Sequence, residues 1–203
     1  MNGITFINTP GYYYSIAYFL AAFLVIRTNR QRGQMKGWKQ WFVHFGFLAA
    51  IVGFMEATDG IRQSLFLPSM MVTIFLLLIY IHFCCEFEWK EAGYYCARAF
   101  ISGEFAASLS WQIYFYCITV KNGLSAWSGW KWIGLLGIYL VVFGILYLLE
   151  RHLQEDVEEI SINKRELLTV IIITAAVFAV SNISYLDQDA LFSSRFAGEM
   201  FTI

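Results

Sequence analysis

Long apolar segments follow one another along most of this chain, and they constrain its fold more than any other feature. A segment that crosses a membrane as a helix needs about 20 mainly apolar residues. The chain is 59% hydrophobic and only 14% charged, whereas a soluble domain carries about 25% charged residues. We therefore predict an integral membrane protein. The six predicted spans cover residues 4–26, 41–55, 67–85, 94–120, 132–149 and 167–186.

The pattern within these segments predicts helices rather than strands. In lipid, backbone N–H and C=O groups must all find partners, which a helix supplies within one segment. Strands of a membrane barrel alternate polar and apolar residues, and stretches such as FLLLIYI, residues 75–81, do not alternate. The expected fold class is all-α, a bundle of about six transmembrane helices. The second segment is short, and we expect its helix to extend to Trp38 or to Thr58.

Basic residues are divided unequally between the two sets of loops. Ten of the 14 Lys and Arg residues lie on the side that contains the first loop, and four lie on the other side. Cytoplasmic loops of membrane proteins carry the excess of Lys and Arg. We therefore expect the first loop to be cytoplasmic and the N-terminus to lie outside. The basic residues of that loop are Arg27, Arg30, Arg32, Lys36 and Lys39.

Glu104 lies near the middle of the fourth apolar segment. A carboxylate at that depth costs about 2.5–3.5 kcal/mol on insertion scales. Arg98 lies about 120° around an ideal helix from Glu104, so we expect Glu104 to have a partner on another helix or to carry a proton. Ser108 and Gln112 follow at intervals of four, with Trp111 between them, on the same face. We predict that Glu104, Ser108, Trp111 and Gln112 form the polar seam of the bundle.

Small residues in two segments predict close contacts between helices. In the fourth segment they are Ala99, Gly103 and Ala107. In the fifth they are Gly134, Gly137, Val141 and Gly144. We therefore expect the fourth and fifth segments to be the inner helices of the bundle.

Other candidate chemistry is weaker. His44 and His82 lie near the inner ends of the second and third segments, as a bis-histidine haem would require, but interfacial histidines are commoner, so no cofactor is expected. We expect no metal site and no catalytic residue. We also expect no nucleic-acid partner, because the net charge is −1 and the basic residues form no single patch. The cysteines lack the spacing of a zinc or redox site, so we expect them to pack as small hydrophobes. They are Cys84, Cys85, Cys96 and Cys117.

Tryptophans gather at the outer end of the fifth segment, where they are typical of an aromatic belt at the membrane interface. Among them, Trp127 and Trp130 are also candidate ligand contacts, and residues 192–196 are a weaker candidate. Six spans would leave residues 187–203 outside the cell. We expect this extracytoplasmic segment to lead into a further span.

Two strings resemble a known family. YYCARAFISGEFAASLSWQIYFY, residues 94–116, resembles the membrane region of bacterial sensor histidine kinases that carry a GHKL-type ATPase domain and are related to peptide-pheromone receptor kinases. SNISYLDQDALFSSRFAGEMFTI, residues 181–203, is similar to the end of their extracytoplasmic segment. The resemblance implies a multi-pass protein of the bacterial plasma membrane, a small-molecule or peptide signal, and a homodimer in the full-length protein.

The chain departs from that family in its catalytic parts. It has neither a dimerisation helix with a phosphoacceptor histidine nor the Asn- and Gly-rich ATP-binding boxes. The resemblance therefore implies a membrane sensor domain, residues 1–186, that passes an external signal to a cytoplasmic kinase domain not present in this chain. A small transporter or channel that uses Glu104 as its coupling carboxylate is the alternative function, and a purely structural membrane partner is a third.

Overall fold

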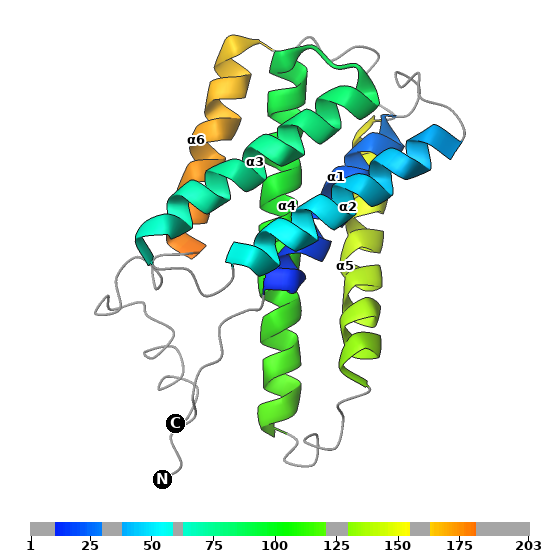
Figure 1. Cartoon of the computed structure of the whole chain (residues 1–203), viewed down its shortest axis with the longest axis vertical. Helices are drawn as coiled ribbons and strands as arrows, with labels where there is room; N and C mark the ends of the chain where they lie inside the picture. The colour runs from blue at the N-terminus through cyan, green and yellow to red at the C-terminus, as the bar shows by residue number, and fades with distance from the viewer. Residues whose placement is uncertain (1–10, 30–37, 59–62, 121–129, 155–162, 182–203) are drawn as a thin grey trace.

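The computed structural model describes residues 11–29, 38–58, 63–120, 130–154 and 163–181. Within these ranges the chain forms α-helices and no strand. The expected all-α class is therefore confirmed for the described part of the chain. The six helices (Figure 1) are α1 (Gly11–Thr28), α2 (Trp38–Thr58), α3 (Gln63–Cys85), α4 (Trp89–Val120), α5 (Trp130–Gln154) and α6 (Lys164–Ser181).

Each helix overlaps one of the six predicted apolar segments. The second helix extends to both Trp38 and Thr58, further than the short apolar core of its segment. The fourth, at 32 residues, starts at Trp89 rather than at residue 94. Residues 4–10 and 182–186, which the prediction included in the first and last spans, lie outside the described residues.

Two helical stretches of the described residues are long and apolar enough to cross a membrane, judged by length and composition alone. They are Trp38–Thr58, with a mean hydropathy of 1.4, and Leu65–Cys85, with a mean hydropathy of 2.1. Only 17% and 28% of their residues are buried within the protein. A core helix of a soluble protein would be mostly buried, so these two helices favour a membrane environment.

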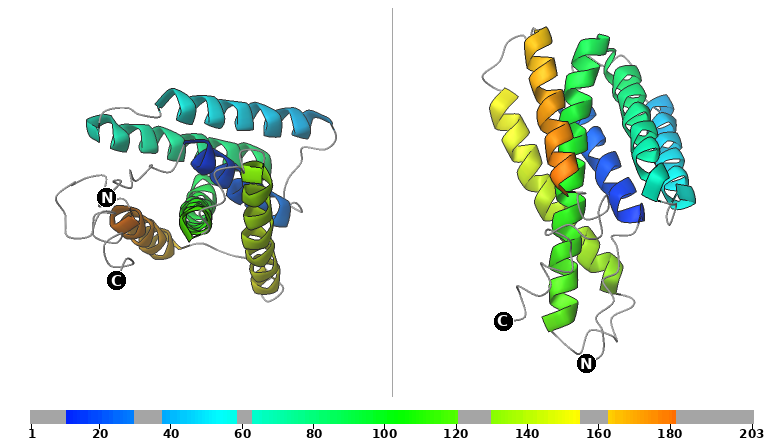
Figure 2. Two further views of the ribbon diagram at one scale, coloured as in Figure 1. Left: turned by 90° about the horizontal axis from the view of Figure 1, so that it is seen from below. Right: turned by 90° about the vertical axis from the view of Figure 1, so that its left-hand side faces the viewer.

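Two helices, α1 and α4, form the centre of the bundle. They share the most extensive interhelical contact, and α1 also contacts α2, α3 and α5, while α6 packs on α4. Figure 2 shows α2 and α3 side by side in one layer, with α5 and α6 on either side of α4. The long α4 therefore contacts α3 on one side and the two flanking helices, α5 and α6, on the other.

The expectation that the fifth helix is an inner one is wrong for its small-residue face. Space is open around Gly137 and Gly144, because a Cβ added to either would meet nothing within 4 Å. Val141 is 62% exposed, and Gly134 lies outside the described side chains. The buried face of α5 is the opposite one. Large side chains such as Tyr139 lie on that face and pack against α1 and α4. The inner partner of α4 is α1, whose buried residues are mostly small or aromatic.

Local hydrogen bonds define where several helices begin and end. Glu86 follows the last residue of α3 with a φ of 53°, a left-handed conformation that commonly terminates a helix. The backbone N–H of Glu88 then donates to Glu91 Oε2 at 3.3 Å at the start of α4. At the start of α6 the N–H of Asn163 donates to Glu166 Oε2 at 3.2 Å. Both contacts are the returning half of a capping box, which satisfies an N-terminal donor.

Candidate functional site

The contact between α1 and α4 is built on small residues. Ala99 and Ala107 of α4 are 1% and 0% exposed, and Gly103 lies between them at the same four-residue spacing. Without a side chain at Gly103, the Tyr18 ring and backbone of α1 lie directly against α4. The prediction of a close helix contact at these three residues is confirmed, and its partner is α1.

Beside this contact, Glu104 forms a buried hydrogen bond with Tyr18. The Tyr18 hydroxyl donates to Glu104 Oε1 at 2.7 Å. Glu104 is 3% exposed and Tyr18 is fully buried. The expectation that Glu104 has a partner on another helix is therefore confirmed. An interaction of this kind is strong in a low-dielectric interior, where losing either partner leaves the other unsatisfied.

The second carboxyl oxygen of Glu104 has no such partner. Oε2 is the single fully buried side-chain nitrogen or oxygen without a hydrogen bond in the described part of the chain. An unsatisfied buried polar atom is costly and is a common mark of a functional or strained site. This oxygen remains able to accept one hydrogen bond from a group that reaches it.

The Tyr18 ring is fixed by aromatic neighbours. It stacks on Phe100 of α4 with the ring centroids 5.1 Å apart and the planes 7° from parallel. Tyr14 stacks on its other flank along α1, at 6.1 Å. Because the ring cannot turn freely, a shift of α1 along α4 would carry the hydroxyl away from Glu104 rather than be absorbed by side-chain rotation.

The structure joins only part of the predicted polar seam. Trp111 is half-buried, and its ring meets Tyr13 of α1 edge-to-face at a centroid distance of 5.1 Å. Ser108 is also half-buried, between Glu104 and Trp111 along the same face of α4. Glu104 and Trp111 therefore face α1, through their contacts with Tyr18 and Tyr13. Four candidates remain untested, since the side chains of Gln112 and Trp130, and all of Trp127 and of residues 192–196, lie outside the described residues.

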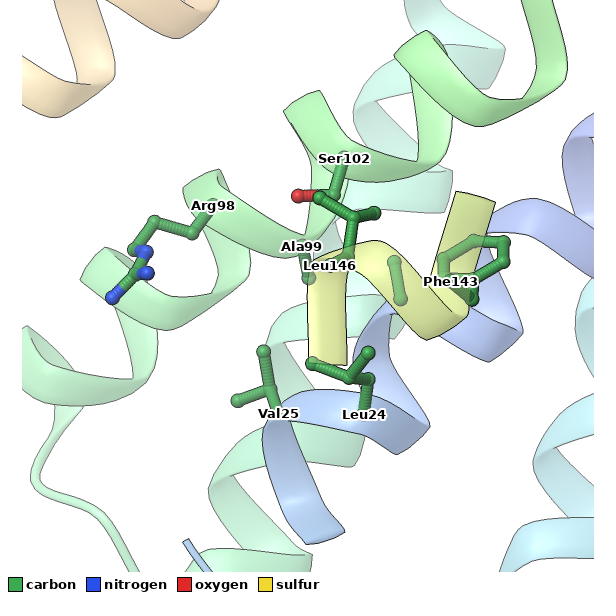
Figure 3. Close-up of a pocket in the computed structure, with 8 residues that line it drawn as sticks. Leu24, Val25, Arg98, Ala99, Ser102, Phe143 and Leu146 are labelled. Carbon is green, nitrogen blue, oxygen red and sulfur yellow. The ribbon is translucent and has the colours of Figure 1, made fainter. Parts of the chain in front are cut away.

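Arg98 does not pair with Glu104. Its guanidinium lies over the ring of Tyr94, 5.6 Å from the ring centroid, and Figure 3 shows it extended away from Ser102. Ser102, Phe143 and Leu146 line a cavity of about 20 Å³ together with residues of α1. A water needs about 10–15 Å³ of such space, so this cavity has room for one water but not for a larger ligand.

A second buried polar pair joins α2 to α3. His44 Nδ1 and the Tyr80 hydroxyl are 2.5 Å apart, and His44 is 4% exposed. His82 makes a separate contact, from Nδ1 to the carbonyl oxygen of Phe87 at 2.7 Å. The two imidazoles therefore make separate local interactions, His44 with Tyr80 and His82 with Phe87.

The described cysteines pack as small buried side chains, as expected. Cys84, Cys85 and Cys96 are free and buried, and the side chain of Cys117 lies outside the described residues. Within the described ranges no three His, Cys, Asp or Glu side chains gather closely enough to hold a metal ion.

Sequence reasoning missed the tyrosines that complete the site. Tyr13 and Tyr18 belong to the cluster YYYSIAY at the start of α1, and a phenol is a donor that an apolar helix can carry at low cost. That cluster was the available signal for a partner of Glu104. Comparison with protein-family models, curated proteins and solved structures finds no match to this chain.

Proposed function

We propose that this chain is the membrane sensor region of a bacterial two-component histidine kinase. It would receive an external signal and pass it to a cytoplasmic kinase domain, for which these residues carry no motif. Two lines of argument support the proposal: the apolar surface of the bundle, and the buried pair between Tyr18 and Glu104. The likeness of residues 94–116 to the membrane region of such kinases adds to both.

The outer surface of the bundle supports a multi-pass membrane location. Large apolar side chains are exposed on every peripheral helix, whereas soluble proteins rarely expose apolar patches beyond a few hundred Å². Lipid would cover these side chains. With the basic first loop in the cytoplasm, the N-terminus is placed outside. Examples, all more than 50% exposed, are Phe42, Phe45, Met71, Phe75, Leu140, Leu148, Leu168 and Ile172.

The observation that carries the sensor proposal is the hydrogen bond between Tyr18 and Glu104. It lies at the closest approach of the two central helices, and the carboxyl group keeps one oxygen without a partner. A signal that favours a slightly different packing of α1 on α4 would break or replace this bond. A ligand shifts a conformational equilibrium by binding one of two arrangements more tightly than the other. The two arrangements here would be two packings of α1 on α4, one with this hydrogen bond and one without it.

The test is a fusion of residues 1–203, through one added transmembrane helix, to the catalytic core of a histidine kinase. The added helix returns the chain to the cytoplasm after six spans. Tyr18→Phe and Glu104→Gln are expected to change autophosphorylation in membranes at least about threefold, because each alters the balance between two helix arrangements. Tyr147→Phe, on an exposed position of α5, is the matched control. If all three variants match the wild type, the sensor proposal is wrong.

The transporter alternative predicts a different result. A buried carboxyl with an unpaired oxygen would also suit proton coupling, so it predicts proton-dependent flux in proteoliposomes that Glu104→Gln abolishes. The sensor proposal predicts no flux in wild-type proteoliposomes. A structural membrane partner predicts neither flux nor an altered kinase output.

A further inference from the structure

A cavity lies where α1 ends and α2 begins. Its volume is about 110 Å³, against the 10–15 Å³ or so that one water requires. It therefore has room for a group of several heavy atoms. It is lined by Phe23, Ile26, Arg27, Gln40, Trp41 and His44.

Four of these six residues carry hydrogen-bond donors, and none is acidic. Arg27 provides a guanidinium that has no ion-pair partner among the described residues. Gln40 provides an amide, Trp41 an indole N–H and His44 an imidazole. A cavity lined by hydrogen-bond donors and by no carboxylate is suited to bind an anion. The first turn of α2 also enters this region, and the first N–H groups of a helix have no partner within the helix.

The hydrogen bond to Tyr80 orients the His44 ring for such a role. Tyr80 is 3% exposed and its hydroxyl is 2.5 Å from His44 Nδ1. When the hydroxyl donates to Nδ1, the neutral imidazole carries its own proton on Nε2. His44 lines the cavity, and with Nδ1 bonded to Tyr80 the ring nitrogen left to donate to a ligand is Nε2.

The cavity lies at the depth of a membrane–water interface. On the first turns of α2, which supplies Gln40, Trp41 and His44 to the lining, four aromatic residues are more than half exposed, as is typical of an interfacial aromatic belt: Trp38, Trp41, Phe42 and Phe45. The sequence between the two helices, residues 30–37, adds Arg30, Arg32 and Lys36. On the predicted topology this is the cytoplasmic face, where anionic lipids and basic segments attract one another.

We propose that this cavity binds the phosphate group of an anionic lipid headgroup. Arg27 would pair with the phosphate oxygens, and Gln40 and the Nε2–H of His44 would donate to them. Phe23 and Ile26 would form the apolar wall of the site. Arginine suits this task because its fork of N–H groups matches a phosphate. The proposal rests on the membrane location argued above and extends it to one specific site.

Native mass spectrometry of the purified full chain in a neutral, phosphate-free detergent tests the proposal, with phosphatidylglycerol and phosphatidylcholine added as probes. Arg27→Gln is expected to weaken phosphatidylglycerol binding about tenfold or more. Lys39→Gln removes the same charge from an exposed neighbour that does not line the cavity, and a loss of about twofold or less is expected. Gln40→Leu should lower binding about threefold without changing the net charge.

Each alternative result is distinct. Equal losses in Arg27→Gln and Lys39→Gln would mean a diffuse attraction between lipid and basic loop, and the proposed site would be wrong. Displacement of the lipid by inorganic phosphate at comparable concentration would assign the site to free phosphate and overturn the lipid source. Equal binding of the two lipids would overturn the anionic preference. Circular dichroism checks that the variants fold, and extraction of the wild type from cell membranes by alkaline carbonate would separately contradict the membrane location.

Discussion

Gly103 of α4 and Tyr18 of α1 leave no room between them for a single methyl group. A Cβ built on Gly103 would lie 2.5 Å from Tyr18 Cδ1 and 3.2 Å from the Tyr18 Cα atom. The ring cannot move aside, because it is stacked on Phe100, and the Cα atom belongs to the backbone of α1. The distance between the two central helices is therefore set at this residue.

Gly103→Ala is expected to destabilise the protein by about 1–3 kcal/mol, the usual cost of adding a methylene to a tightly packed core. The substitution should also lengthen the bond between Tyr18 and Glu104, since α1 must move outward. Gly53→Ala is the matched control: Gly53 is also within a helix but has nothing within 4 Å of an added Cβ. It should be neutral or stabilising by up to about 1 kcal/mol. Thermal unfolding in detergent, followed by circular dichroism, measures both, and equal effects would contradict the close contact.

Tyr18→Phe is expected to cost about 1–3 kcal/mol, because it leaves both carboxyl oxygens of Glu104 buried without a donor. Glu104→Leu should cost a similar amount by leaving the Tyr18 hydroxyl unpaired. The double variant should cost less than the sum, since replacing both partners with apolar groups can be nearly neutral. The coupling free energy from the double-mutant cycle should exceed about 0.5 kcal/mol. Strict additivity would show that the hydrogen bond contributes nothing to stability.

Tyr139 connects α5 to α1, since its hydroxyl donates to the carbonyl oxygen of Tyr13 at 2.7 Å. Tyr139→Phe should destabilise the protein by about 0.5–1.5 kcal/mol, the usual net value of such a bond. Tyr147→Phe removes the same atom from an exposed position of the same helix and should change stability by less than about 0.5 kcal/mol. Unfolding midpoints that fall equally in the two variants would be inconsistent with a specific bond at Tyr139.

Glu86 adopts a left-handed backbone conformation between α3 and α4, with a φ of 53°. Residues with a Cβ pay about 1–2 kcal/mol there, and glycine does not. Glu86→Gly should therefore raise the free energy of unfolding by up to about 1 kcal/mol. Glu86→Ala keeps the Cβ and should give no such gain, so the difference between the two variants isolates the backbone effect. A gain in Glu86→Ala as large as that in Glu86→Gly would point to the lost charge instead.

The sequence was sufficient to predict the number and class of the described helices. Apolar segments of helical length dominate the pattern, and each of them became a helix. The sequence was less reliable for the residues at which each helix begins and ends. The start of α4 at Trp89 depends on the contact between Glu88 and Glu91, and charged residues there do not look like part of an apolar segment. Capping depends on side chains three residues apart, which a hydropathy pattern does not detect.

Pairing between helices was only partly predictable. The small residues around Gly103 correctly indicated a close contact, but the same reasoning failed for Gly137 and Gly144, which face outward. The spacing of glycines indicates a helix face without bulky side chains, but it does not show whether another helix packs on that face. Likewise, the cost of burying Glu104 predicted a partner on another helix, but Tyr18 could not be identified, because a bond across 86 residues of chain leaves no local sequence pattern.

The separation of Tyr18 and Glu104 along the chain also has a consequence for biosynthesis. Ribosomes add about 5–20 residues per second, so α1 would wait roughly 4–17 s for its partner on α4 to be made. On the proposed membrane location, α2 and α3 emerge during that time, and α1 stays nearby in the membrane without its central contact. When α4 then leaves the insertion machinery, Tyr18 is the donor that would lower the cost of placing Glu104 in lipid. The first helix would thus serve as an intramolecular chaperone for the fourth.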